Sequence, residues 1–159
     1  MNIQRGDMFA SVVPGGDVWI GTPVSASLRK TGALVMGAGH ALQVKQRWPG
    51  VDRAFGVQIS MIPTDGTAGI TPSRFGVLPN PSRNLLAFQT KLEWRWPSSL
   101  ELIGFSARKL DTLMERNPSM VVHLAMPGIG LGGLREDEVL AELARWVHHK
   151  DRLHLWSLA

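Results

Sequence analysis

The stretch from Ser119 to Arg145 constrains the fold of this chain most, because it joins a strand pattern directly to a helix pattern. Residues 120–126 form a mostly apolar run, which is typical of an interior strand of a parallel or mixed sheet. Apolar residues then recur at helical spacing between positions 139 and 147. A strand followed at once by a helix is the repeating unit of α/β folds.

The turn between this strand and this helix holds four glycines within six residues, at positions 128, 130, 132 and 133. A tight turn needs glycine at one or two positions for its backbone angles. Bare N–H groups at the end of a strand and the start of a helix, by contrast, form a phosphate-binding site. Four glycines therefore predict a loop that faces a ligand.

The same glycines also match the spacing of the dinucleotide-binding fingerprint. That fingerprint requires an acidic residue about 20 positions further on, at the end of the next strand. Asp151 instead precedes the next apolar run, at residues 153–156. We therefore do not predict a nicotinamide-binding domain.

The composition sets broad limits on the class of protein. With 159 residues, 44% hydrophobic and 19% charged, the chain is expected to form a single globular domain over residues 1–159. A net charge of +4 suits a polyanionic ligand, either a nucleotide or a nucleic acid. Cysteine is absent, which excludes disulfides and thiolate metal sites. Without an apolar leader or a membrane-length run, we expect a cytoplasmic protein with no membrane partner.

Strand and helix patterns alternate along the rest of the chain. The sequence predicts an edge strand at 1–5, a strand at 17–22 ended by Pro23, a strand or short helix at 55–62, an exposed turn-rich segment at 64–73, short strands at 75–78 and 152–156, and a buried strand at 85–89. Ser98 and Glu101 are spaced as a capping box that opens a helix. This alternation predicts an α/β fold with helices on both faces of a sheet.

A second glycine-rich turn lies between Gly32 and Trp48, where Gly37 and Gly39 lead into a helix that Pro49 ends. One such turn binds one phosphate, and two that converge bind a pyrophosphate from both sides. The alternative is that the two turns lie far apart and only the later one binds a ligand.

Other polar and aromatic residues give weaker signals. For His40, contact with a phosphate and a partly exposed structural role are equally supported, whereas His123 fits a core histidine. The six tryptophans are expected in the core by default, and a base-binding role for Trp94 or Trp96, which bracket Arg95, is the less favoured interpretation. The sequence shows no metal-ligand spacing, and we expect neither a metal nor a cofactor.

Taken in order, four motifs resemble the macrodomain family: GD near the N-terminus, then VMGAGHALQVKQRWPG, FQTKLEWR and MPGIGLGG. The resemblance covers residues 4–156. It implies a three-layer α/β/α sandwich with a mixed, mostly parallel sheet, and binding of ADP-ribose. The lysine after the middle strand resembles the branch of hydrolases that remove ADP-ribose from protein carboxylates or from DNA bases.

The resemblance also implies roles for individual residues. The Asp7 carboxylate, with Met8 beside it, would accept a hydrogen bond from the adenine amino group, and Lys91 would be catalytic. The distal ribose and one phosphate would lie along a loop of Met36, Gly37, Ala38 and Gly39. The pyrophosphate would lie in a loop of Gly128, Ile129, Gly130, Leu131, Gly132 and Gly133.

Two positions depart from the family pattern. Ser25 stands where such macrodomains carry an asparagine against the distal ribose, and its single hydroxyl replaces an amide. This departure weakens the prediction of catalysis. Gly132 stands where some relatives have a catalytic aspartate, which favours the branch acting on DNA bases over the branch acting on protein carboxylates.

The sequence leaves the chemistry of Lys91 open. Its ammonium would stabilise a leaving group, its neutral amine would attack the anomeric carbon, and outside the resemblance it would be an ordinary exposed lysine. The favoured hypothesis is a hydrolase that acts on an ADP-ribosylated macromolecule. The alternative is a non-catalytic reader or sequestering module for ADP-ribose or a related nucleotide. A sequence-independent nucleic-acid binder is a third, less favoured hypothesis.

Overall fold

The computed structural model describes residues 1–61 and 75–157. The strands are β1 (Asn2–Arg5), β2 (Val18–Ser25), β3 (Val77–Asn80), β4 (Leu85–Lys91), β5 (Val121–Ala125) and β6 (Leu153–Ser157). The helices are α1 (Met8–Ser11), α2 (Gly39–Arg47), α3 (Val51–Met61), α4 (Leu100–Arg116) and α5 (Glu136–Trp146), with 3-10 turns η1 (Gly130–Gly132) and η2 (Lys150–Arg152). The turn-rich segment predicted at 64–73 lies outside the described residues.

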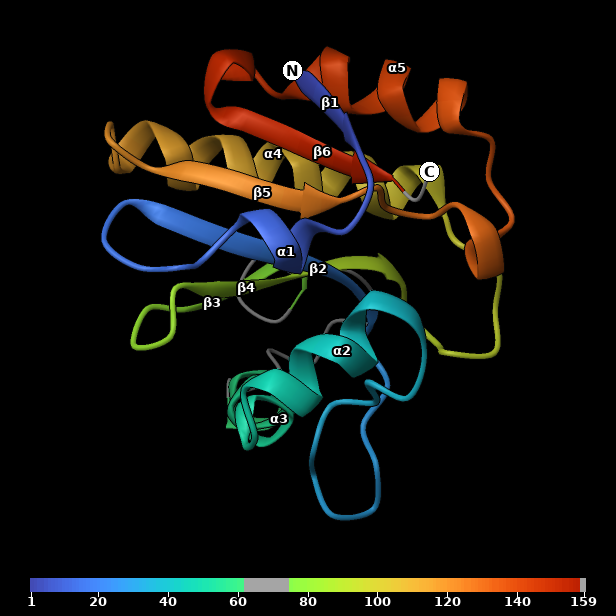
Figure 1. Cartoon of the computed structure of the whole chain (residues 1–159). Coiled ribbons are helices and arrows are strands. Elements are labelled where there is room, and N and C mark those ends of the chain that lie inside the picture. The colour runs from blue at the N-terminus through green and yellow to red at the C-terminus, as the bar shows by residue number, and fades with distance from the viewer. Residues whose placement is uncertain (62–74, 158–159) are drawn as a thin grey trace.

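The six strands form one sheet in the order β1-β6-β5-β2-β4-β3. All neighbouring pairs are parallel except β3 and β4, which are antiparallel. Helices α4 and α5 cover one face of the sheet, and α1, α2 and α3 lie on the other (Figure 1). The predicted three-layer α/β/α sandwich with a mixed, mostly parallel sheet is therefore confirmed.

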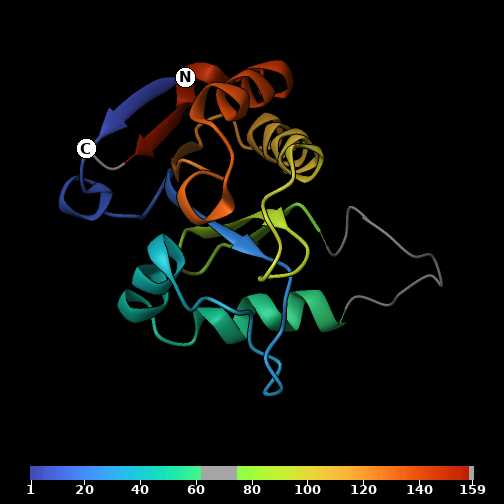
Figure 2. The same ribbon diagram turned by 90° about the vertical axis from the view of Figure 1, so that its right-hand side faces the viewer.

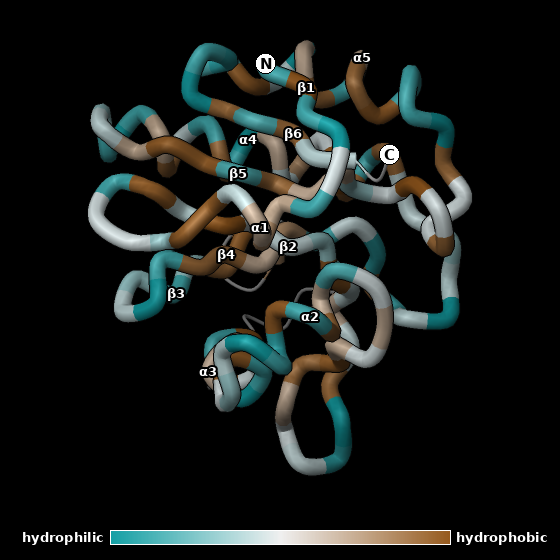
Figure 3. The backbone as a smooth tube through the Cα atoms, in the orientation of Figure 1, coloured by the Kyte–Doolittle hydropathy of each residue, from teal (hydrophilic) through white to brown (hydrophobic). Residues whose placement is uncertain are grey.

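Two apolar clusters hold the layers together, one on each side of the sheet. Alternate residues of the central strands supply both clusters, because successive side chains of a strand point to opposite faces. In β4, Leu86 and Phe88 pack toward α4, whereas Leu85 and Ala87 pack toward α2 and α3. All four are fully buried, and Figure 3 shows the hydrophobic residues following the central strands.

The strand predicted at 17–22 does not end at Pro23, but continues to Ser25. Residues along this segment hydrogen-bond alternately to the two neighbouring strands. The carbonyl of Asp17, just before β2, accepts from the Val121 N–H of β5, and the Ile20 N–H donates to the carbonyl of Asn84, just before β4. Pro23 therefore faces the β5 side, where pairing has already ended at Gly21. Because the missing N–H of Pro23 has no ladder partner to lose, the strand tolerates it.

The helix start predicted at Ser98 also needs correction. Ser99, not Ser98, caps α4, and its hydroxyl oxygen accepts from the Leu102 N–H at 3.3 Å. Ser98 is instead buried, and its hydroxyl has no hydrogen-bond partner within the described segments. Residues 55–61 of the segment predicted as strand or short helix at 55–62 belong to helix α3, and residue 62 lies outside the described residues.

Candidate functional site

Five parallel strands end at the same edge of the sheet, so the loops that follow them gather there. Asp7 follows β1, residues 26–38 follow β2, residues 92–99 follow β4, and residues 126–135 follow β5. Figure 2 looks onto this edge. The structure therefore brings every residue predicted from the sequence to one edge of the sheet, while the role of each in binding stays a prediction.

Ser25 and Lys91 are two predicted residues that pair across neighbouring strands. They are opposite each other in β2 and β4, just past a register shift between Val24 and Ser25. The Ala26 N–H donates to the Lys91 carbonyl at 3.0 Å and fixes this pairing. Ser25 is buried, and its hydroxyl accepts from the Ser27 N–H at 3.2 Å. Lys91 is half-buried, and no carboxylate in residues 1–61 and 75–157 forms an ion pair with its ammonium.

The glycine loop after β5 forms the short 3-10 turn η1. Gly130, which opens the turn, has φ 64°, a conformation that favours glycine. The Gly132 N–H donates to the Ile129 carbonyl at 3.2 Å and the Gly133 N–H to the Gly130 carbonyl at 3.0 Å. The N–H groups of Ile129, Gly130 and Leu131 donate to no acceptor in the part of the chain that the structure describes. Three consecutive unpaired N–H groups form an anion-binding site.

The sequence suggested that the glycine loop leads straight into a helix, but the structure shows a gap between the two. Helix α5 begins only at Glu136, and its first turn carries Glu136, Asp137 and Glu138. These three carboxylates repel an anion from that helix end. A phosphate is thus expected at η1 itself and not at the start of α5.

Helix α2 offers the second anion-binding end. Its N-cap residue, Ala38, makes no side-chain hydrogen bond, and its first turn carries no acidic residue. The first N–H groups of α2 are consequently left for an external acceptor. The Arg29 guanidinium lies beside Gly37, since a β-carbon on Gly37 would be 3.8 Å from one of its nitrogens. This cation adds a positive charge to the loop at residues 36–39.

Asp7 lies at the same edge, next to β1. Its Oδ1 accepts from the Phe9 N–H at 3.0 Å and caps α1, which leaves Oδ2 for another donor. Met8 and Met36, which the resemblance had placed against the ligand, are buried in the core with 3% and 1% of their surfaces exposed. Their side chains pack in the apolar cluster next to the site and are not exposed to a ligand.

Three residues that sequence reasoning had not combined lie between Asp7 and the loop at 36–39. His40 Nδ1 is 2.9 Å from the Thr22 hydroxyl, and the imidazole stacks on the Phe9 ring with centroids 4.8 Å apart. Burial lowers the pKa of His40 to about 4, and the nearby Asp7 carboxylate partly opposes this shift. No sequence motif links residues 9, 22 and 40, which come from three separate elements.

The segment after Lys91 carries two tryptophans that are not in the core. Trp94 is 50% exposed and Trp96 is 58% exposed, contrary to the default expectation. The Arg95 guanidinium lies 5.0 Å from the Trp94 ring centroid. The backbone N–H of Trp94 donates to the Ser27 hydroxyl at 2.9 Å, and this hydrogen bond connects the segment to the loop after β2.

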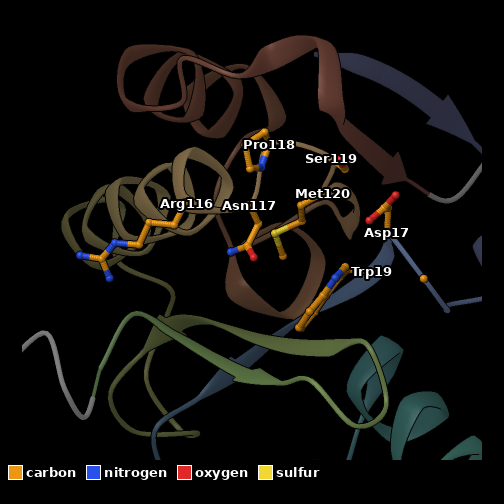
Figure 4. A pocket seen from close by; sticks show the side chains of 8 residues that line it. Asp17, Trp19, Arg116, Asn117, Pro118, Ser119 and Met120 are labelled. Carbon is orange, nitrogen blue, oxygen red and sulfur yellow. The ribbon is translucent and has the colours of Figure 1, made fainter.

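A separate hollow lies at the opposite edge of the sheet, where β2 and β5 begin (Figure 4). It contains none of the site residues predicted from the sequence, and its lining is Gly16, Asp17, Trp19, Arg116, Asn117, Pro118, Ser119 and Met120.

Over residues 1–61 and 75–157, no three histidine, aspartate or glutamate side chains are grouped as metal ligands. In the same residues, no helix is long and apolar enough to span a membrane.

The sequence matches no protein-family model and no curated protein. The structure, however, is similar to the macrodomain of Thermus aquaticus DarG, with 23% identity and a TM-score of 0.69 over 99% of this chain and 97% of that chain. It is also similar to the macrodomain of Mycobacterium tuberculosis DarG, with 22% identity and a TM-score of 0.67 over 99% of this chain and 98% of that chain. Thermosipho africanus DarTG, in complex with ADP-ribose, is 18% identical with a TM-score of 0.68, over 99% of this chain and 42% of that chain. The chain therefore has the macrodomain fold.

Proposed function

We propose that this protein binds ADP-ribose at the edge formed by Asp7, Lys91 and the two glycine loops, and hydrolyses ADP-ribosyl groups from a modified macromolecule. The observation that carries the proposal is the run of unpaired N–H groups at Ile129, Gly130 and Leu131. They lie at the same edge as the uncapped start of α2, so two anion-binding elements are available for one pyrophosphate. The ADP-ribose bound by DarTG, which shares the fold, supports this ligand.

Lys91 is the residue proposed for the chemical step. Hydrolysis breaks the bond between the anomeric carbon and the carrier, and water supplies the hydroxyl of the product. Because no carboxylate of the described residues pairs with the Lys91 ammonium, its charge is available to stabilise the departing group. Attack by the neutral amine is the second route, and the two differ in whether a covalent intermediate forms.

The carrier that best suits this site is a base of single-stranded nucleic acid. Trp94 and Trp96 are exposed, and both follow Lys91 closely in the chain. Exposed aromatic rings with a cation between them bind successive unstacked bases. Gly132 supplies no carboxylate for the chemistry expected of hydrolases that act on protein carboxylates.

A calorimetric titration with ADP-ribose tests the binding proposal, with ADP and NAD as comparison ligands. Gly130→Glu should abolish binding, because a β-carbon at this position meets nothing within 4 Å and the added carboxylate would repel the pyrophosphate. Gly130→Ala is the matched control, since it carries the same backbone strain at φ 64° without the charge. If wild-type protein does not bind ADP-ribose, the proposal is wrong.

A non-catalytic reader of ADP-ribose is the alternative function. It is favoured by Ser25, which is buried and already accepts a hydrogen bond from Ser27, so it replaces the expected asparagine poorly. The two functions differ in turnover. A reader binds ADP-ribosylated oligonucleotide and leaves it unchanged, whereas a hydrolase releases ADP-ribose.

A further inference from the structure

His40 joins three elements of the proposed site. It is the second residue of α2, directly after the loop at residues 36–39. Its Nδ1 is 2.9 Å from the Thr22 hydroxyl of β2, which anchors the ring to the sheet. Its other contact is a stack on Phe9 of α1, with the two rings 17° from parallel.

Phe9 is held between two residues of the same helix face. The Arg47 guanidinium carbon lies 4.4 Å from the Phe9 ring centroid, and the His40 centroid lies 4.8 Å from it. Residues seven positions apart in a helix are separated by about 10 Å along its axis. The Phe9 ring therefore fits between them, and α1 can neither slide along α2 nor tilt away without breaking one contact.

Asp7 moves with α1 because its carboxylate caps that helix through the Phe9 N–H. The Phe9 stack consequently sets where the free oxygen of Asp7 lies relative to Gly37, Ala38 and Gly39. His40 is the residue that fastens both ends of this connection, since it contacts Phe9 and the sheet directly.

A histidine is a costly choice for packing alone at this position. Its Nε2 is buried and has no partner among the described residues. A buried polar atom without a hydrogen bond costs free energy that an apolar ring of similar size would not. Asp7 is the charged group within electrostatic reach of the imidazole, and Arg47 lies beyond the Phe9 ring.

We propose that His40 is a positioning residue of the ADP-ribose site, which holds the Asp7 carboxylate in place against the loop at residues 36–39 through Phe9 and Thr22. This inference rests on the proposed function, because it assigns the Asp7 carboxylate to the adenine amino group. His40 itself need not touch the ligand.

A double-mutant cycle with Asp7→Asn tests this mechanism. Asparagine preserves the helix cap but replaces the free carboxylate oxygen with an NH2 group, which cannot accept a hydrogen bond. If His40 acts through Asp7, His40→Ala should weaken ADP-ribose binding about tenfold in the wild type and less than about twofold in the Asp7→Asn protein. His40→Phe keeps an aromatic ring to stack on Phe9 but removes the hydrogen bond to Thr22, so it should restore only part of the affinity that His40→Ala loses.

The controls separate a local role from a folding defect. Gln43→Ala changes an exposed residue of the same helix and should leave both affinity and thermal midpoint unchanged. An equal loss from His40→Ala in both backgrounds, or no loss in either, overturns the inference while the proposed function stands. Absence of ADP-ribose binding by the wild type contradicts the proposed function instead.

Discussion

Gly132 packs so closely on Ser98 that no side chain fits there. A β-carbon on Gly132 would overlap the Ser98 hydroxyl oxygen and lie 3.1 Å from the Ser98 β-carbon. The Ser98 N–H also donates to the Gly132 carbonyl at 2.9 Å. Because Ser98 is buried next to the start of α4, this contact fixes the loop after β5 to the body of the protein.

We expect Gly132→Ala to displace this loop and its unpaired N–H groups. Overpacking a buried contact costs about 1–3 kcal/mol, and the N–H groups of Ile129, Gly130 and Leu131 lose their alignment. ADP-ribose affinity should fall more than tenfold, since a loss of about 1.4 kcal/mol in binding free energy corresponds to a tenfold change. Calorimetric titration and a thermal melt measure the two effects separately.

A second substitution tests whether the contact with Ser98 is the cause. Ser98→Ala removes the hydroxyl, which has no hydrogen-bond partner in the described chain, and should restore part of the affinity of Gly132→Ala. Gly15→Ala is the control, because a β-carbon there would meet nothing within 4 Å and the residue lies before β2 begins, outside the two glycine loops. Equal losses from Gly132→Ala and Gly15→Ala would argue against this account.

Lys91→Ala should separate binding from turnover. Release of ADP-ribose from a modified oligonucleotide should fall at least about a hundredfold, the size expected when one group that stabilises a transition state is removed. Binding of free ADP-ribose should change little, because the unpaired N–H groups of the glycine loops are untouched. Turnover that survives in Lys91→Ala would assign the chemistry elsewhere, and no turnover in the wild type would favour a reader.

The sheet and the two glycine loops could be predicted from the sequence because local patterns specify them. The apolar run at 85–89 predicts a buried strand, and a parallel strand delivers Lys91 to the edge where the other strands also end. Likewise, glycines at 37 and 39 and at 128–133 mark turns whatever the rest of the chain does.

The remaining features of the site depend on contacts between distant segments. Ser98 and Ser99 are equally good capping residues, and only the packing of Ser98 under Gly132 assigns the cap to Ser99. From the sequence alone, Pro23 predicts the end of a strand. Only the structure shows that Pro23 faces the side of β2 where pairing with β5 has already ended. His40 looked equally like a phosphate ligand and an exposed residue, because its partners, Phe9 and Thr22, lie 31 and 18 positions away.

Trp94 and Trp96 should matter for the carrier but not for ADP-ribose itself. Replacing both with alanine should weaken binding of an ADP-ribosylated single strand by about tenfold or more, since stacking on an aromatic ring contributes about 1–3 kcal/mol per base. Affinity for free ADP-ribose should stay unchanged. Val13→Ala, which removes another exposed apolar side chain, is the control. An equal loss for the free nucleotide and for the modified strand would contradict a role in carrier binding.

Acid should destabilise the fold through histidines that are held neutral. The His123 and His154 rings stack with centroids 4.6 Å apart, and Trp156 Nε1 donates to His123 Nδ1 at 3.0 Å. Burial, with a smaller contribution from His154, lowers the pKa of His123 to about 4. Burial and then the N-terminal ammonium lower the pKa of His154, and burial lowers the pKa of His40 to about 4.

Each of these imidazoles binds a proton more readily in the unfolded chain, where its pKa is about 6.5. The free energy of unfolding should therefore be greatest above pH 6.5 and fall as the pH drops from 6.5 toward 4. For His40, the more buried ring, a folded pKa of about 4 against 6.5 corresponds to at most roughly 3 kcal/mol. The more exposed His123 should contribute less, because water screens its interactions.

Urea unfolding at a series of pH values measures this dependence. His123→Gln should flatten the curve between pH 6.5 and 4, because glutamine does not titrate there. Burial raises the carboxyl pKa of Asp111, but hydrogen bonds from His148 and His149 outweigh it and lower the pKa overall, so the stability that Asp111 contributes is lost mainly below its usual 3.8. A slope between pH 6.5 and 4 therefore belongs to the histidines, and an unfolding free energy that stays constant over that interval would mean that the rings accept protons without leaving their stack.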